Sequence, residues 1–155
     1  MLYYKNKKMK ALSQIRIFII DDDKFYLTYI EQLLKKRNFQ NVFVFESGRE
    51  CLQKMVNPPD IVVLDYHLAD EVGVDVMKSL RAIYPDLPII FLTSQKSIDV
   101  VVDIMKKGAN DCIKKGDSDI YQLVSSIVFI FENINNEKKS RLFRKLKSGF
   151  ISLVF

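Results

Sequence analysis

The chain alternates short apolar runs with stretches of helical periodicity, and this pattern repeats five times between residues 15 and 131. The apolar runs are rich in β-branched residues and lack polar alternation, which is typical of strands buried on both faces of a parallel sheet. Five strand–helix repeats predict one α/β domain with right-handed crossovers and helices on both faces of the sheet. The expected strands are residues 15–20, 42–45, 61–64, 89–92 and 111–113, and the expected helices are residues 24–37, 47–56, 72–83, 97–107 and 117–131.

Several of the expected helix ends carry local signals. Ser47 is placed to cap the N-terminus of the second helix, and Asp117 or Ser118 that of the fifth. The prolines of Asn57-Pro58-Pro59 end the second helix, since proline cannot continue the hydrogen-bond ladder. Gly108 follows the fourth helix, where glycine commonly takes the left-handed conformation that closes a helix.

The charge is distributed unevenly along the chain. The net charge is +5, but residues 1–14 carry +4, residues 132–155 carry +4, and residues 15–131 carry −3. We expect these ranges to be a basic N-terminal extension, a folded domain, and a basic amphipathic C-terminal tail, with the polar residues 133–137 ending the domain. Because the cations are not gathered on the folded part, no direct DNA binding is expected.

Length and composition are those of an ordinary soluble protein. The chain has 155 residues, 48% hydrophobic and 28% charged, which suits a single domain with a substantial core. Its apolar runs are too short to cross a bilayer, and the lysine-rich N-terminus lacks the apolar segment of a signal peptide. Cys51 and Cys112 show neither metal-ligand spacing nor a disulfide framework, so a cytoplasmic protein is expected.

Acidic residues stand directly after two of the expected strands. Asp21, Asp22 and Asp23 follow the first strand, and Asp65 follows the third. Open α/β sheets bind ligands at the carboxyl ends of their strands, so these carboxylates are expected to converge there. Their mutual repulsion calls for a cation, and a set of oxygen ligands suits Mg²⁺. Asp23 is interpreted separately, as the N-cap of the helix that follows or as a surface charge.

These residues, taken in order, make the chain resemble the receiver domains of bacterial two-component response regulators, over about residues 15–131. Asp21 and Asp22 match the acidic pair of that family, and Asp65 matches its phospho-acceptor. The match also includes Gly73 shortly after the acceptor, Thr93 and the small Ser94 after strand four, Gly108-Ala109 before strand five, and Lys115 at its end. The resemblance implies a flavodoxin-like receiver fold, a doubly wound five-stranded parallel sheet of order 2-1-3-4-5.

The resemblance also implies a function and a role for each site residue. Asp65 would accept a phosphoryl group from a sensor histidine kinase or histidine phosphotransfer protein. Mg²⁺ would be held by Asp21, Asp22, Asp65 and the backbone carbonyl of His67, with the His67 imidazole only lining the rim. Lys115 and Thr93 would contact the phosphoryl oxygens. A downstream protein would then be contacted through the helix 4–strand 5–helix 5 face, and the chain would not be a turnover enzyme.

Three positions depart from the usual pattern of the family. Ala69 stands in place of a proline in the loop after the acceptor. Gly116 replaces the proline after the lysine, and because a cis bond without proline costs about 2.5–4 kcal/mol, a trans bond is expected there. Cys112 occupies the position of the aromatic switch residue, so the switch is expected to depend on Thr93 and Lys115.

Two other functions compete with this interpretation. A phosphatase of the haloacid dehalogenase type also uses a strand-end aspartate with Mg²⁺, but it needs a second aspartate where this chain has His67. A docking module that keeps the fold without being phosphorylated would be consistent with Cys112 and Gly116. The complete set of acidic, threonine and lysine residues favours the phospho-acceptor.

The C-terminal tail has its own pattern. Leu142, Phe143, Leu146 and Phe150 recur near helical spacing among lysines and arginines. A helix of this kind suits an anionic membrane surface or a partner groove, whereas the simpler interpretation is a helix packed on its own domain or in a homodimer.

Overall fold

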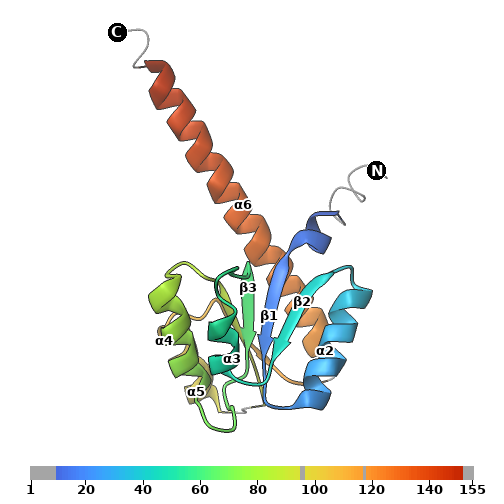
Figure 1. Cartoon of the computed structure of the whole chain (residues 1–155). Coiled ribbons are helices and arrows are strands. Elements are labelled where there is room, and N and C mark those ends of the chain that lie inside the picture. The colour runs from blue at the N-terminus through green and yellow to red at the C-terminus, as the bar shows by residue number, and fades with distance from the viewer. Residues whose placement is uncertain (1–9, 95–96, 117, 152–155) are drawn as a thin grey trace.

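The computed structural model is an α/β domain from which one long helix projects (Figure 1). It describes residues 10–94, 97–116 and 118–151, with residues 145–151 described as backbone only. A five-stranded parallel sheet has the order β2-β1-β3-β4-β5, which confirms the predicted topology. Its strands are β1 (Arg16–Ile20), β2 (Asn41–Phe45), β3 (Ile61–Leu64), β4 (Ile89–Thr93) and β5 (Asp111–Lys114).

Five helices accompany these strands. They are α2 (Lys24–Lys36), α3 (Gly48–Gln53), α4 (Gly73–Ile83), α5 (Ile98–Lys106) and α6 (Asp119–Ile151). Residues 10–14, in the expected N-terminal extension, are also helical, and Leu12 packs on the core. The expected caps are confirmed at Ser47, whose side chain accepts a hydrogen bond from the Glu50 N–H, and at Gly108, which has a φ of 95°.

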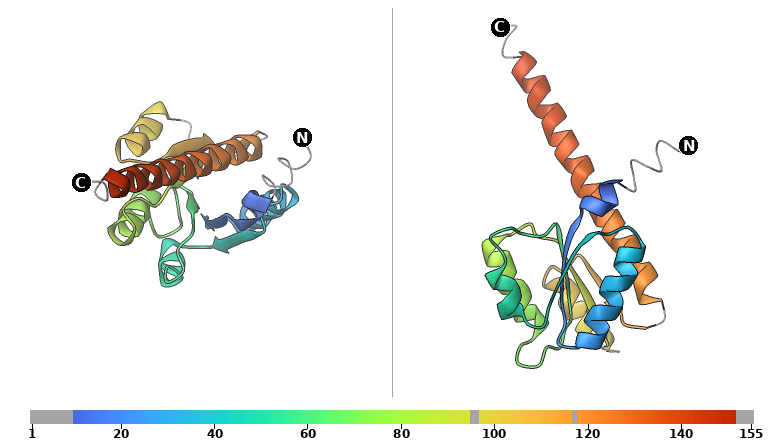
Figure 2. Two further views of the ribbon diagram at one scale, coloured as in Figure 1. Left: turned by 90° about the horizontal axis from the view of Figure 1, so that it is seen from above. Right: turned by 45° about the vertical axis from the view of Figure 1, so that its right-hand side comes forward.

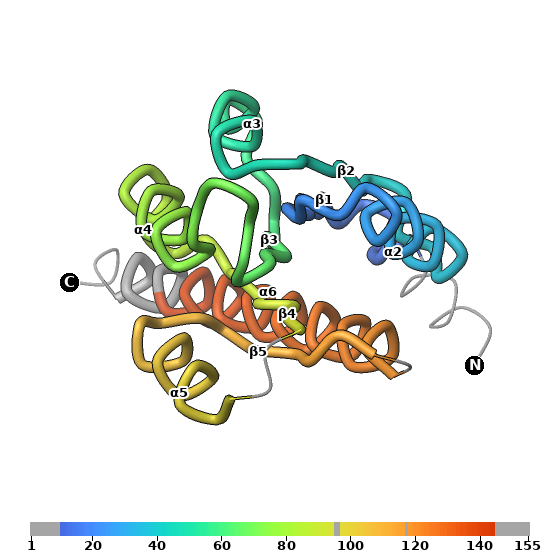
Figure 3. Tube along the Cα trace, turned by 90° about the horizontal axis from the view of Figure 1, so that it is seen from below, coloured from blue at the N-terminus to red at the C-terminus, as the bar shows by residue number. Residues whose placement is uncertain are grey.

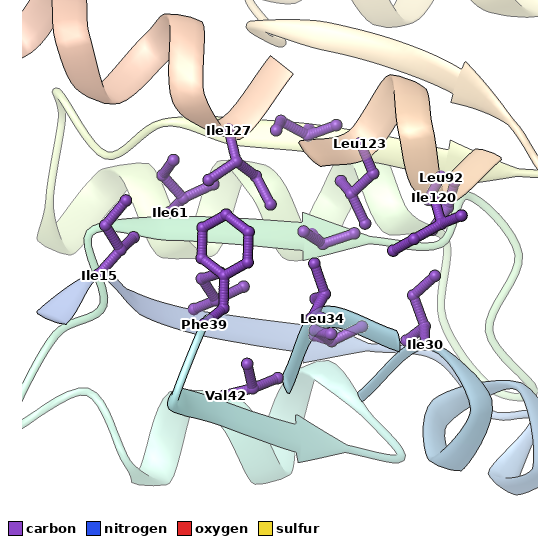
Figure 4. Close-up of a cluster of buried hydrophobic side chains, with 14 of the residues drawn as sticks. Ile15, Ile30, Leu34, Phe39, Val42, Ile61, Leu92, Ile120, Leu123 and Ile127 are labelled. Carbon is purple, nitrogen blue, oxygen red and sulfur yellow. The ribbon is translucent and has the colours of Figure 1, made fainter. Parts of the chain in front are cut away.

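The core has two layers, one on each face of the sheet. Because side chains alternate along a strand, Ile17 and Ile19 of β1 face one layer, while Phe18 and Ile20 face the other. The first layer is covered by α2 and α6, and Figure 4 shows side chains from both helices meeting those of the strands. The second layer is covered by α3, α4 and α5. Both faces are therefore buried, which explains why the strands read as continuous apolar runs.

The last helix extends much further than expected. The predicted end at residue 131 is wrong, because α6 continues without a break through the polar stretch to Ile151. That stretch contains no glycine or proline, and Ile134 within it still packs on the core. The glutamate, lysine, arginine and leucine residues that follow are good helix formers. Polarity alone is therefore not a stop signal. Of the two expected caps, Asp117 lies outside the described residues and the helix begins just after Ser118.

Candidate functional site

The sheet brings the predicted acidic residues together at one end. Ile20 at the end of β1 pairs with Leu64 at the end of β3, so Asp21 and Asp65 come next to each other. The Asp65 N–H donates a 2.9 Å hydrogen bond to the Ile20 carbonyl, which continues the ladder to the site. One carboxylate oxygen each from Asp21, Asp22 and Asp65 lies within 4.8 Å of the others. In Figure 3 the domain is seen from this end of the sheet.

Asp23 is separated from this cluster by its role in the helix. Its side chain accepts hydrogen bonds from the N–H groups of Phe25 and Tyr26, at 2.9 and 3.1 Å, and so caps α2. The Asp23 N–H in turn donates to the Asp21 carboxylate at 3.0 Å. The interpretation of Asp23 as a cap is confirmed, and its backbone helps to fix the orientation of Asp21.

Lys115 reaches across the sheet to the same carboxylates. Its ammonium group donates to the Asp21 carboxylate at 2.5 Å and to the Asp65 carboxylate at 3.0 Å. Thr93 is 1% exposed and lies on the adjacent strand end, where its carbonyl accepts a 2.9 Å hydrogen bond from the Lys115 N–H. The residues predicted from β1, β3, β4 and the end of β5 therefore lie around one point.

The electrostatics of the site are dominated by burial. Asp21 is 2% exposed, and removal from water raises the pKa of its carboxyl group, although the hydrogen bond from Lys115 partly opposes this. Burial acts to lower the pKa of the Lys115 ammonium, but hydrogen bonding to Asp21 and the two nearby carboxylates outweigh it and leave that pKa raised. Lys115 pairs with Asp21 and Asp65, and the third carboxylate, Asp22, lies beside them, so acidic groups outnumber the cation at this site.

The donor set fits a divalent cation. All the side-chain ligand atoms in the cluster are carboxylate oxygens, and the exposed Asp22 lies at its solvent edge. His67 follows two residues after Asp65 in the adjoining loop, and its exposed imidazole packs edge-on against Tyr66. Within the described residues, the His67 imidazole is not among the clustered ligand atoms.

Position 73 requires a glycine, because the start of α4 lies very close to the end of the acceptor strand β3. Its N–H donates a 2.8 Å hydrogen bond to the Tyr66 carbonyl. A Cβ atom at this position would lie 2.2 Å from the Asp65 carbonyl oxygen and 2.9 Å from the Phe91 ring. The first turn of α4 can therefore pack against the loop after β3 only because residue 73 has no side chain.

Tyr26 and Asp119, which were not identified from the sequence, link Lys115 and the residue after it to helix α2. The Tyr26 ring lies 4.5 Å from the Lys115 ammonium, a cation–π contact. The Tyr26 hydroxyl donates a 2.7 Å hydrogen bond to Asp119, whose buried carboxylate also accepts one from the Gly116 N–H at 3.3 Å. Nothing in the sequence marks these residues as partners, because 93 positions separate them.

The structure shows the surroundings of the three positions that depart from the family pattern. Within the described residues there are no cis peptide bonds, so the expected trans bond before Gly116 is confirmed. Asp119 receives the Gly116 N–H, a donor that a proline would lack. Cys112 is half-buried beside the α3–α4–α5 layer, and burial raises the pKa of its thiol. Ala69 is exposed in the loop after Asp65.

Comparison with known proteins places this site in a family. The response regulator receiver domain matches residues 17–127, which is most of the chain. The chain belongs to this family. Its receiver domain has the predicted fold, and the acidic cluster of Asp21, Asp22 and Asp65 fits the phosphorylation site of two-component response regulators.

Individual relatives agree with this assignment. The chain is 30% identical over 115 residues to the transcriptional regulatory protein ZraR of Klebsiella oxytoca. This match covers 73% of the chain and 26% of ZraR. It is 36% identical over 76 residues to the regulatory protein LuxO of Vibrio vulnificus. This match covers 48% of the chain and 17% of LuxO. The chain thus spans only a small part of these curated relatives.

Solved structures match the fold. A response regulator receiver domain protein from Clostridium thermocellum superimposes with a TM-score of 0.68 at 27% identity, covering 80% of this chain and 97% of that one. The receiver domain of the Francisella response regulator 1452 gives a TM-score of 0.71 at 24% identity over 78% of this chain and 99% of that one, a likeness of fold alone.

Proposed function

We propose that this receiver domain accepts a phosphoryl group on Asp65 in a Mg²⁺-dependent reaction. The observation that supports this most directly is the convergence of Asp21, Asp22 and Asp65 with the Lys115 ammonium at the carboxyl end of the sheet. Asp65 is 7% exposed, and its Oδ1 accepts a hydrogen bond from the Tyr66 N–H while Oδ2 faces Lys115. Its carboxylate is thus held in one orientation, as a nucleophile requires.

Each neighbouring residue has a role in this proposal. Asp21, Asp22, Asp65 and the His67 carbonyl would hold Mg²⁺, which neutralises charge on the phosphoryl group when bound. Lys115 would release its contact with Asp65 and contact a phosphoryl oxygen. The Thr93 hydroxyl would donate a hydrogen bond to another oxygen and draw the loop after β4 inward.

The donor that fits best is a phosphohistidine of a sensor kinase or phosphotransfer protein. The Asp65 oxygen would form a new O–P bond as the N–P bond of the donor breaks, and the imidazole would keep the electron pair and take up a proton. Later hydrolysis would return the carboxylate and inorganic phosphate. The chain would act as a phospho-acceptor that signals through protein contacts, with the α5–β5–α6 surface as the output face.

Mass spectrometry of the intact protein tests the proposal. Incubation with acetyl phosphate should add one phosphoryl group when Mg²⁺ is present, and Asp65→Asn should abolish the addition. Asp22→Ala should weaken labelling strongly, whereas the matched change Asp23→Ala removes only a helix cap and should leave labelling near that of the wild type.

The other outcomes assign the competing functions. Undiminished labelling of the Asp65→Asn protein would show that another residue is the acceptor. A wild-type protein that no small donor or kinase labels would favour the docking module. Steady release of phosphate from a generic phosphate ester would favour the phosphatase.

A further inference from the structure

The C-terminal part of α6 extends away from the domain, and its described side chains are exposed to solvent. Ile134 still packs on the core layer beneath α2 and α6, but every residue from 136 to 144 is exposed. Figures 1 and 2 show this part of the helix projecting beyond the sheet. The simpler interpretation of the tail, a helix packed on its own domain, is therefore wrong for the described residues.

The projecting segment combines apolar and basic residues. Leu142 is 59% exposed and Phe143 is 68% exposed, although burial of such side chains is strongly favourable. From residue 138 to the end of the sequence there are six lysines and arginines and no acidic residue. The cations are Lys138, Lys139, Arg141, Arg144, Lys145 and Lys147.

Helical spacing separates these two kinds of residue. At about 100° per residue, Leu142, Phe143, Leu146 and Phe150 fall within an arc of about 100°, which we call the apolar stripe. Five of the six cations lie outside this arc. The exception is Lys139, at the end of the segment nearest the domain. A narrow apolar stripe beside a broad basic face is typical of helices that lie in a membrane interface.

We propose that this segment docks on the surface of an anionic phospholipid bilayer, with the apolar stripe inserted among the acyl chains. The partner must offer both negative charge and apolar depth, and an anionic bilayer offers both. A second copy of the helix would instead bring six cations against six. A polyanion such as DNA would neutralise the charge but leave the stripe exposed.

The proposed contact is a surface contact. Among the residues that the structure describes, no helix is long and apolar enough to cross a membrane. The segment leaves the domain at the amino ends of the strands, whereas Asp65 lies at their carboxyl ends (Figure 1). A receiver docked in this way would keep its phospho-acceptor site facing the solution, and the docking does not depend on phosphorylation.

A single reporter tests the insertion, because the chain contains no tryptophan. Phe143→Trp places the only indole in the apolar stripe, and Tyr121→Trp places it at an equally exposed position of α6 on the domain (66% for Tyr121 and 68% for Phe143). With phosphatidylglycerol-containing vesicles, the emission of Phe143→Trp should shift to shorter wavelength, while that of Tyr121→Trp should stay unchanged. Pure phosphatidylcholine vesicles should cause little shift in either.

Charge variants of the full chain complete the test. Removing one cation from the surface should weaken vesicle binding about fivefold, so Arg141→Ala with Arg144→Ala should weaken it about 25-fold. The matched control, Lys36→Ala with Lys54→Ala, removes the same charge from exposed positions of the domain and should change binding little.

Three results would overturn the proposal. The first is the absence of binding to anionic vesicles by the wild-type chain. The second is a stable dimer in light scattering that Phe143→Gln dissociates, which would show that a second copy covers the stripe. The third is binding to vesicles that Phe143→Gln leaves unchanged while DNA competes for it, which would indicate a general polyanion contact.

Discussion

Gly73→Ala should damage the acceptor site through backbone displacement alone. The new methyl group would lie 2.2 Å from the Asp65 carbonyl oxygen, whereas ordinary van der Waals contact begins near 3.4 Å. The obstacle is backbone, together with the Phe91 ring at 2.9 Å, so no flexible side chain can give way. The loop carrying the acceptor or the start of α4 must therefore move by roughly 1 Å.

This displacement sets the expected magnitudes. Overpacking of a buried site costs about 1–3 kcal/mol of the free energy of unfolding. For a chain of this size, each kcal/mol lowers the melting temperature by roughly 2–4 °C. A shift of about 1 Å in a reacting group also costs on the order of 100-fold in rate, so labelling of Asp65 by acetyl phosphate should slow more than stability alone predicts.

Gly116→Ala is the matched control in urea unfolding. It adds the same methyl group to a second glycine of the site, but a Cβ atom there would meet nothing within 4 Å. Because alanine restricts the unfolded chain, this variant should be unchanged or more stable by about 0.4–1 kcal/mol. Equal unfolding free energies for the two variants would refute the steric argument.

Three further predictions concern Lys115 and its neighbours. Tyr26→Phe and Asp119→Asn should each lower the free energy of urea unfolding by about 1–3 kcal/mol, and the double variant should lose less than the sum of the two single losses. Additive losses would contradict the shared hydrogen bond. Lys115→Met should bind Mg²⁺ more tightly in calorimetry, because the ammonium no longer competes for Asp21 and Asp65; weaker binding would count against the common site. In the absence of Mg²⁺, the free energy of unfolding should fall as pH rises from 3.8 through the raised pKa of the Asp21 carboxyl group, because the folded state holds this proton more tightly than the unfolded state does. An equal dependence of the unfolding free energy on pH in Asp21→Asn would exclude this contribution.

Much of the architecture was predictable because it follows from local pattern. Apolar runs such as 15–20 and 61–64 are buried on both faces of the sheet. A strand with two buried faces is apolar along its whole length, because the side chains on both faces lie in the core. Right-handed crossovers then leave few topologies for five strand–helix repeats. Asp21 and Asp65 could be paired from the sequence because parallel strands end at the same edge.

The end of α6 could not be placed in the same way. A helix continues where its next turn packs on the domain or consists of good helix formers. Here Ile134 supplies the packing, and the basic residues after it supply the helix propensity. The polar stretch at 133–137 therefore had no local signal strong enough to end the helix, and its polarity was misleading. The exposure of Leu142 and Phe143 follows from this continuation.

The sequence by itself determined the order of the elements and the residue types at each strand end, because periodicity and spacing are properties of the chain. Only the tertiary structure decided how those residues meet. The contact of Tyr26 with Lys115 and Asp119 joins helix α2 to the start of α6. The need for glycine at 73 likewise arises from the approach of α4 to the Asp65 carbonyl. Such contacts depend on the docking of separate elements, and local sequence carries no record of that geometry.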